Sequence, residues 1–216
     1  MAGPVGWHRC GAKNFSLAPE WCRQFNAVLG STPALAEVNT LPDFLRRGLR
    51  IVSIGLNPSP LSVKSGFYFA NPRNRFWRAL NLSGLIAEPL TPSVKAMQTL
   101  FRLEGIGFTD VVKRTTRGGA ELRAEDYRRD VPKLKAKLER FEPCIAWFHG
   151  KQAYGLYLRY GEGLAQEKAS WGVQTLGIGS SRAYVTPNPS PANAAYSLDD
   201  LTRWYRRLAS YASRRE

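Results

Sequence analysis

Short apolar runs alternate with longer amphipathic segments along the chain from residue 43 onward. Four short runs rich in β-branched and aromatic residues, each bounded by turn residues, predict strands at 49–55, 105–112, 144–150 and 183–186. The spacing of apolar residues predicts helices at 71–84, 91–105, 124–143, 151–161 and 197–213. Strands that alternate with helices favour a parallel sheet covered on both faces. The pattern therefore predicts an α/β fold, a three-layer α/β/α sandwich around a central four-stranded parallel sheet.

Polar residues and prolines predict where three of these helices begin. Asn71 precedes a proline and is expected to cap the helix over 71–84. Ser197 and Asp200 have the spacing of a capping box, with Asp in place of the usual Glu. Pro132 predicts that the basic helix over 124–143 starts or kinks there.

The first forty residues do not follow this alternation. "APEWCRQFNAVLG" predicts a short helix over 18–30, and "STPALAEVNTLP" that follows is typical of a linker. We find no internal repeat. A chain of 216 residues is long enough for one domain with a substantial core. We therefore expect an N-terminal extension over 1–42 and a single domain over 43–216.

The net charge of the chain indicates what kind of partner it binds. Lys and Arg number 31 against 17 acidic residues, which gives a formal net charge of +14 and a pI near 10.1. A positive charge of this size favours a polyanionic partner, most often nucleic acid. The alternative is a protein whose basic helix faces are simply solvated.

Cysteine and histidine usage argues against metal chemistry. The three cysteines are scattered, and only two histidines exist, so neither a disulfide framework nor a zinc or iron–sulfur site is expected. No stretch approaches the roughly 20 apolar residues of a membrane span, and the N-terminus lacks the apolar core of a signal peptide. We expect a cytoplasmic, nucleoid-associated protein without cofactor, metal or membrane contact.

Each predicted strand ends on polar residues: Asn57, Asp110, His149 and the segment 188–190. In a parallel sheet, ligands bind outside the carboxyl ends of the strands, so these groups are expected to converge on one site. Simpler interpretations exist for each. Asn57 can close an Asx turn, Asp110 can cap a turn or pair with a nearby cation, and His149 can be a packed strand-end residue.

Five segments resemble the mismatch-specific uracil/thymine-DNA glycosylases of the uracil-DNA glycosylase superfamily, in the same order as in that family. They are "GLNPS" at 55–59, "GFYFANPRNRFW" at 66–77, "GKQAY" at 150–154, "WGVQTLGIGS" at 171–180 and "TPNPS" at 186–190. The resemblance covers roughly residues 43–211. It implies a four-stranded parallel sheet between helices and hydrolysis of the N-glycosidic bond of a flipped-out uracil or related pyrimidine in DNA. A base inside a stacked duplex cannot be attacked, which is why it must be flipped.

The resemblance also implies roles for individual residues. Asn57 is expected to position the attacking water, and Phe69 to stack on the extruded base. Leu56 and Ser59 are expected to line the pyrimidine edge through their backbones, Ser62 to shape the pocket near C5, and Asn188 to contact the base. The wedge loop, which fills the gap left by the base, corresponds to Ser190, Pro191, Ala192, Asn193 and Ala194.

The chain departs from the family's pattern at three places. Asn188 replaces the histidine of the fastest uracil glycosylases, which predicts neutral donors to the leaving group and slow turnover. Ala192 and Ala194 stand near the family's bulky wedge residue, which predicts weak discrimination of the opposite base. Asp110 stands where the best-known relatives have lysine or asparagine, and we expect it to act in catalysis beside Asn57.

The sequence thus predicts a monomeric, monofunctional uracil-DNA glycosylase that acts on uracil-containing DNA and starts base excision repair. One alternative is a catalytically inactive nucleic-acid-binding module with the same fold, against which the intact Asn57 and Phe69 argue. Another is a nucleotide hydrolase, but the chain lacks a phosphate-binding G-x-x-x-x-G-K-[ST] loop and an acidic metal cluster.

Overall fold

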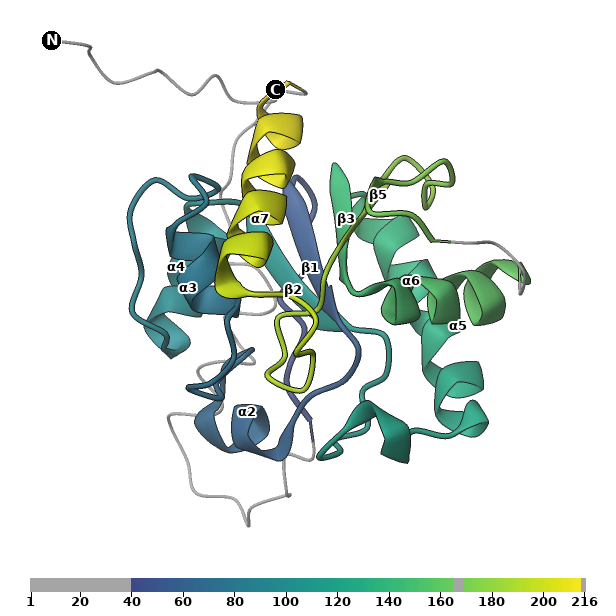
Figure 1. Cartoon of the computed structure of the whole chain (residues 1–216). Helices are drawn as coiled ribbons and strands as arrows, with labels where there is room; N and C mark the ends of the chain where they lie inside the picture. Colours follow the sequence, from purple (N-terminus) through teal and green to yellow (C-terminus); the bar gives the residue numbers. More distant parts are fainter. Residues whose placement is uncertain (1–39, 165–168, 215–216) are drawn as a thin grey trace, which may run out of the picture. The chain divides into compact units, whose positions relative to one another are not determined.

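A computed structural model describes residues 40–164 and 169–214 (Figure 1). The helix predicted over 18–30 and most of the linker that follows it lie outside the described residues, as do His8, Cys10 and Cys22. The boundary after residue 42 stays a prediction. Leu41 is nonetheless buried, and the carbonyl of Pro42 accepts a hydrogen bond from the Tyr68 hydroxyl.

A twisted sheet forms the centre of the fold. Its strands are β1 (Ile51–Gly55), β2 (Ile106–Asp110), β3 (Ile145–His149), β4 (Gly172–Val173) and β5 (Arg182–Thr186), in the order β2-β1-β3-β5-β4. The four strands predicted from the sequence are present, and they pair in parallel. The predicted strand count is wrong, because β4 adds a fifth strand antiparallel to β5. Two residues are too few to show a period-two pattern in the sequence.

Helices cover both faces of the sheet. They are α2 (Pro60–Ser65), α3 (Phe76–Asn81), α4 (Val94–Arg102), α5 (Ala124–Phe141), α6 (Lys151–Tyr157) and α7 (Leu198–Ser213), with a 3-10 turn, η1 (Gly119–Glu121), and a π turn, η2 (Leu158–Glu162). In Figure 1, α3, α4 and α7 lie on one side of the sheet, and α5 and α6 lie on the other. This is the predicted α/β sandwich. Within the described ranges, none of the helices has the length and apolar content needed to cross a bilayer.

The structure corrects two predicted helix starts. The helix expected from Asn71 begins instead at Phe76, because the Asn71 side chain closes a turn by accepting from the Arg73 amide at 2.9 Å. Helix α5 runs through Pro132 rather than starting there. The capping box of α7 is confirmed: Ser197 Oγ accepts from the Asp200 amide, and Asp200 Oδ2 accepts from the Ser197 amide. Helix α2, hidden in a proline-rich stretch that resembles a turn, was not predicted.

Aromatic rings fill the layer between the sheet and α3 and α7. Phe76 of α3 lies 5.8 Å from Trp147 of β3 between ring centroids, and Tyr205 of α7 lies 4.7 Å from the same ring. All three side chains are buried. This rigid layer supports the residues at the carboxyl ends of the strands, because it fixes the helices that pack beside them.

Candidate active site

The ends of the parallel strands bring polar side chains into one row. Asp110 is paired with Gly55, and His149 with Thr186. Gly55 and His149 directly follow the paired residues Ile54 and Phe148, so the row runs across four strands. A Cβ at Gly55 would lie 2.6 Å from Asp110 Oδ1, so the carboxylate keeps this position only because residue 55 is glycine. The missing side chain leaves room for the carboxylate over the end of β1.

A pocket of about 170 Å³ opens above this row. It brings together most of the residues that the sequence suggested for the site: Leu56, Asn57, Ser59, Ser62, Phe69, Asp110, Asn188 and Ser190. A second hollow of about 560 Å³ adjoins it and is lined in part by Ala192 and Asn193. Pro191 and Ala194 are exposed and line neither hollow.

The amide of Asn57 is held in one orientation. Its Nδ2 donates to Thr116 Oγ1 at 2.7 Å and lies 3.2 Å from the carbonyl oxygens of Pro58 and Arg114. Its Oδ1 accepts no hydrogen bond from any residue in the part of the chain that the structure describes. An amide fixed through its nitrogen presents its oxygen as a free acceptor, which can take a hydrogen bond from water.

Asp110 is a buried carboxylate at the end of β2, with 4% of its surface exposed. Burial raises its pKa from the usual 3.8 to about 6, although Lys113 and the Tyr68 hydroxyl favour the charged form. The ion pair with Lys113 considered from the sequence does exist, with Nζ 3.4 Å from Oδ2. It compensates only part of the cost of burial. The pKa of such a group lies close to the range in which a carboxylate acts as a general base.

Lys113 is shared between two carboxylates. Its Nζ is closer to Asp43 Oδ1, at 2.9 Å, than to Asp110, and Asp43 also pairs with Lys137 at 2.5 Å. Lys113 therefore lowers the pKa of Asp110, while the nearby negative charge of Asp43 raises it. This second layer of charges sets how readily Asp110 takes up a proton.

The Phe69 ring lines the pocket from the loop between α2 and α3. Its backbone has a φ of 58°, a left-handed conformation that is rare for a bulky residue. One face of the ring stacks on Phe76, with centroids 4.1 Å apart and planes inclined by 17°. The opposite face is the one that the ring can offer to a ligand.

The other two aromatic rings of this loop pack against the protein. Tyr68 is buried beneath the pocket, and Phe67 contacts Trp77 edge-on at 6.3 Å between centroids. Ser59 caps α2, its Oγ accepting from the amide of Ser62. Ser62 Oγ in turn accepts from the Ala70 amide at 3.3 Å. The two serines therefore tie the start of α2 to the loop that carries Phe69.

The loop after β5 places Asn188 in the pocket. Asn188 Oδ1 accepts from the Ser190 amide at 2.9 Å, which leaves the two N–H groups of its side chain as donors. Asn193 Nδ2 donates back to the Asn188 carbonyl at 2.9 Å. Part of the hydrogen-bonding capacity of Asn193 is thus used within the loop.

Arg75 holds this loop in place, a role that the sequence analysis did not predict. At the start of α3, its guanidinium donates to the carbonyls of Ser190 at 2.6 Å, Asn193 at 2.8 Å and Tyr196. The Arg75 amide also donates to the Pro189 carbonyl at 3.1 Å. A single cation therefore supports the whole wedge loop through backbone oxygens.

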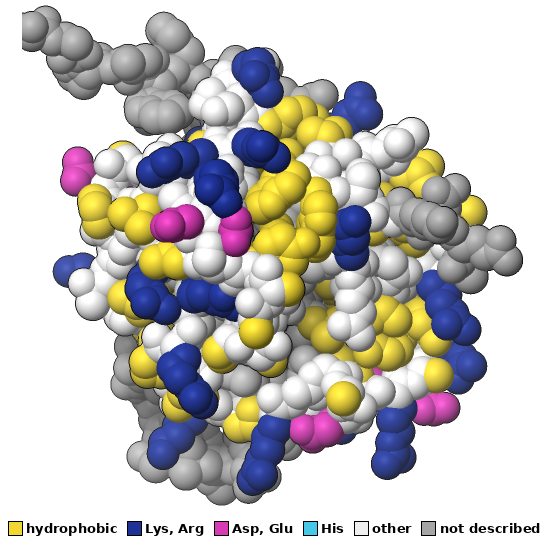
Figure 2. Space-filling model, viewed as in Figure 1, with side chains coloured by type: hydrophobic (Ala, Val, Ile, Leu, Met, Phe, Trp, Pro, Cys, Tyr) yellow, Lys and Arg dark blue, Asp and Glu magenta, His cyan; other side chains and the backbone are white. Residues whose placement is uncertain are grey.

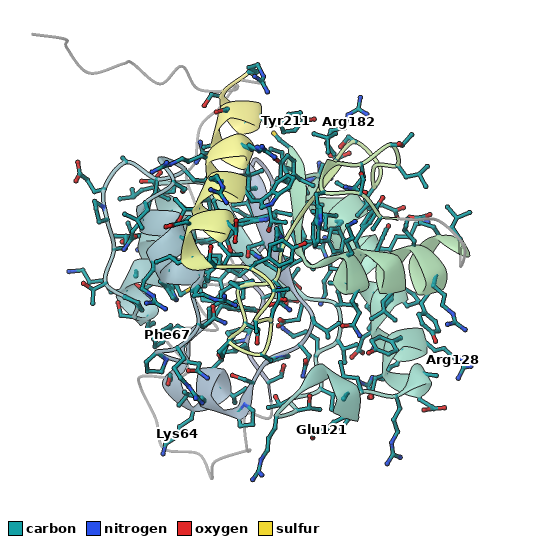
Figure 3. The ribbon with its side chains drawn as sticks, viewed as in Figure 1. Lys64, Phe67, Glu121, Arg128, Arg182 and Tyr211 are labelled. Carbon is teal, nitrogen blue, oxygen red and sulfur yellow. The ribbon has the colours of Figure 1, made fainter. Side chains whose placement is uncertain are left out.

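Basic side chains contribute to the lining of the two hollows. Lys64 and Phe67, near α2, and Glu121, at η1, lie toward the lower end of Figure 3, whereas Arg182, which begins β5, lies at the upper end. The carboxyl ends of the strands therefore face downward in this view. Lys and Arg side chains lie along the lower edge of the molecule in Figure 2, and the exposed Arg117 and Lys151 line the hollows. Such cations suit a phosphate backbone.

The donor types present do not suggest a metal centre. Across residues 40–164 and 169–214, no group of three or more His, Cys, Asp and Glu side chains could hold a metal ion.

Comparison with known proteins places this chain in a family. The model of the uracil DNA glycosylase superfamily matches residues 42–209, about three quarters of the chain. The chain belongs to the uracil DNA glycosylase superfamily. A solution structure from Methanosarcina acetivorans, described as a candidate uracil DNA glycosylase, shares the fold with a TM-score of 0.53 and 24% identity. That match covers 80% of this chain and 98% of the archaeal one. Membership in this superfamily implies a DNA glycosylase.

Proposed function

We propose that the protein is a mismatch-specific type of uracil-DNA glycosylase that removes flipped-out uracil from DNA as a monomer. The observation that carries the proposal is the pairing, in one pocket, of the fixed Asn57 amide with the buried Asp110 carboxylate. The amide is neutral and cannot act as a useful base near neutral pH, whereas the carboxylate can.

The two residues divide the work of hydrolysis. Asn57 Oδ1 accepts a hydrogen bond from a water molecule and orients it toward C1′ of the flipped nucleotide. As the N-glycosidic bond breaks, the bonding electrons leave with the base and the sugar becomes cationic. The water oxygen bonds to C1′, and Asp110 takes up the proton that the water loses. The negative charge of Asp110 also stabilises the cationic sugar in the transition state.

The remaining residues of the pocket bind the base. Phe69 stacks on it, which is worth roughly 1–3 kcal/mol per base. The backbones of Leu56 and Ser59 line its edge, Ser62 shapes the pocket near C5, and Asn188 offers neutral N–H donors. Ser190, Pro191, Ala192, Asn193 and Ala194 enter the space that the base leaves in the duplex.

An assay for abasic sites tests this function directly. Purified protein is incubated with a duplex that contains one uracil, and abasic sites are converted to strand breaks with alkali. Cleavage at the uracil alone supports the proposal. Binding without cleavage, across opposite bases and single strands, would instead favour an inactive nucleic-acid-binding module.

The single-turnover rate should depend on pH through Asp110. Because the carboxylate is the active form and its pKa is raised to about 6, the rate should be level above pH 7 and fall about tenfold by pH 5. Lys113 lowers this pKa, so Lys113→Met should move the inflection to higher pH. A profile that is flat from pH 5 to pH 8 in both proteins would exclude Asp110 as the base.

Phe69→Ala should weaken productive binding of the flipped base by roughly 1–3 kcal/mol, because the stacking surface is lost. Single-turnover excision measured against protein concentration gives both the binding and the rate constant. Phe67→Ala, in the same loop but packed on Trp77, is the matched control and should change excision little. Excision by Phe69→Ala at the wild-type rate would mean that another ring does the stacking.

The wedge loop should discriminate little between guanine and adenine opposite the uracil. The methyl groups of Ala192 and Ala194 fill the gap in the duplex poorly and offer no hydrogen bonds. Rates on matched U·G and U·A duplexes should differ by less than about a hundredfold, or ~2.7 kcal/mol, and single strands should also be accepted. A larger preference for guanine would point to the free Oδ1 of Asn193 as the group that reads the opposite base.

A further inference from the structure

His149 carries a polar atom that the fold leaves without a partner. The side chain ends β3, is 2% exposed and lines the pocket beside Phe69. Its Nε2 lies 2.8 Å from Ser53 Oγ on β1. Its Nδ1 is buried and has no hydrogen-bond partner among the described residues. Several buried side-chain polar atoms in the described residues have no partner, and His149 Nδ1 is the one whose residue lines the pocket, so its missing partner calls for an explanation there.

The Ser53 contact decides which ring nitrogen carries the proton. Ser53 is completely buried, and the histidine is its only side-chain hydrogen-bond partner in the part of the chain described by the structure. If Nε2 held the proton, the Ser53 hydroxyl hydrogen would be left unpaired in the core, which costs about 1–3 kcal/mol. Ser53 therefore donates to Nε2. The proton of the neutral ring is then on Nδ1, which becomes a donor.

The surroundings keep this ring neutral. Its neighbours are the rings of Trp147, Phe69, Phe76 and Tyr205, at centroid distances of 4.4, 5.1, 5.5 and 6.3 Å. Burial lowers the pKa of His149 from 6.5 to about 3. A neutral ring keeps one N–H donor across the whole physiological range of pH.

We propose that His149 donates a hydrogen bond from Nδ1–H to a keto oxygen of the extruded base. The inference rests on the proposed function, since the same pocket holds Phe69, the proposed stacking ring, in edge contact with this histidine. Negative charge grows on the keto oxygens as the base departs, so the bond strengthens in the transition state and accelerates the reaction. Cytosine carries an exocyclic amino group at that position, and two N–H donors cannot form a hydrogen bond with each other. The contact therefore disfavours cytosine and favours deaminated bases, which carry a keto oxygen there.

The tautomer of His149 can be determined by a measurement that does not depend on excision activity. The chain has two histidines, His8 and His149, so ¹⁵N-histidine NMR gives two sets of ring signals, which His8→Ala assigns. We expect His149 to show a protonated Nδ1 and a bare Nε2, unchanged between pH 5 and pH 8. A duplex with a 2′-fluorinated, cleavage-resistant uracil nucleotide should shift the Nδ1 signal, and the corresponding cytosine duplex should not. A protonated Nε2, or no response to the uracil duplex, would overturn the inference.

Kinetics test the effect on the reaction. His149→Phe with Ser53→Ala removes the donor without leaving an orphan hydroxyl, and it should lower the single-turnover rate on the order of 10² with DNA affinity unchanged. Ser53→Ala alone keeps the ring but no longer holds its proton on Nδ1, so it should lose part of the rate and less than the double variant. His149→Gln, which restores an N–H donor, should recover part of the rate.

The outcomes separate the two proposals. If wild-type protein excises uracil and the double variant does so equally fast, the inference is wrong while the proposed function stands. If wild-type protein excises no uracil but its Nδ1 signal responds only to the uracil duplex, hydrolysis is wrong while the keto-reading role of His149 stands.

Discussion

Asp110→Asn is expected to slow the chemical step of uracil excision by on the order of 10²–10⁴ while leaving DNA affinity nearly intact. The amide fills the same space but cannot accept the proton from water, and it carries no charge to stabilise the cationic sugar. Single-turnover excision with protein in excess isolates this step. Binding to a cleavage-resistant uracil duplex, measured separately, reports affinity.

Gly55→Ala offers a second route to the same site. It keeps the carboxylate but places a methyl group 2.6 Å from its Oδ1, so the side chain must move away from the pocket floor. We expect excision to fall with Gly55→Ala as well. Thermal unfolding checks that neither variant has simply lost its fold. If Asp110→Asn retains the wild-type single-turnover rate, Asn57 acts alone and the carboxylate belongs to the scaffold.

Asn57→Ala should reduce single-turnover excision on the order of 10²–10³, because the attacking water loses the oxygen that orients it. The double variant with Asp110→Asn should lose less than the product of the two single losses, since both residues act on the same water molecule. Losses that multiply fully would show that the two residues act independently.

Thr116→Val is the matched test of how Asn57 is held. Thr116 Oγ1 is the closest acceptor of the Asn57 amide and does not itself reach toward the sugar in the proposed mechanism. Its loss should free the amide to rotate and should cost part of what Asn57→Ala costs. A Thr116→Val protein as fast as wild type would mean that the carbonyls of Pro58 and Arg114 fix the amide sufficiently.

The strands and the convergence of the site follow from local sequence. Runs such as "IVSIG" and "IAWFH" have strong β character, and the polar residues that follow them must meet at one edge of a parallel sheet. The strand β4 and the late start of α3 could not be predicted in this way. A side chain such as that of Asn71 can either cap a helix or close a turn by hydrogen bonding to the backbone. The sequence is the same in both cases, so it cannot show where the helix begins.

Long-range contacts set the properties of individual site residues. The pKa of Asp110 depends on Asp43, and the fixed amide of Asn57 depends on Thr116. In the sequence, nothing distinguishes Arg75 from the other arginines of this basic protein. Its role follows only from its hydrogen bonds to backbone carbonyls. Both interpretations of His149 hold, because it is a buried strand-end residue and it also lines the pocket. Its unpartnered nitrogen is visible only once Ser53 is placed beside it.

The attachment of the wedge loop through Arg75 has a mechanical consequence. Arg75 immediately precedes Phe76, whose ring forms the backing of Phe69. The proposed wedge loop and the proposed stacking ring are therefore both held at the start of α3. Because the loop is already ordered by four carbonyl contacts, little conformational entropy remains to be lost when DNA binds. Under the proposed function we therefore expect movement of the loop against the duplex and movement of the Phe69 ring to be coupled.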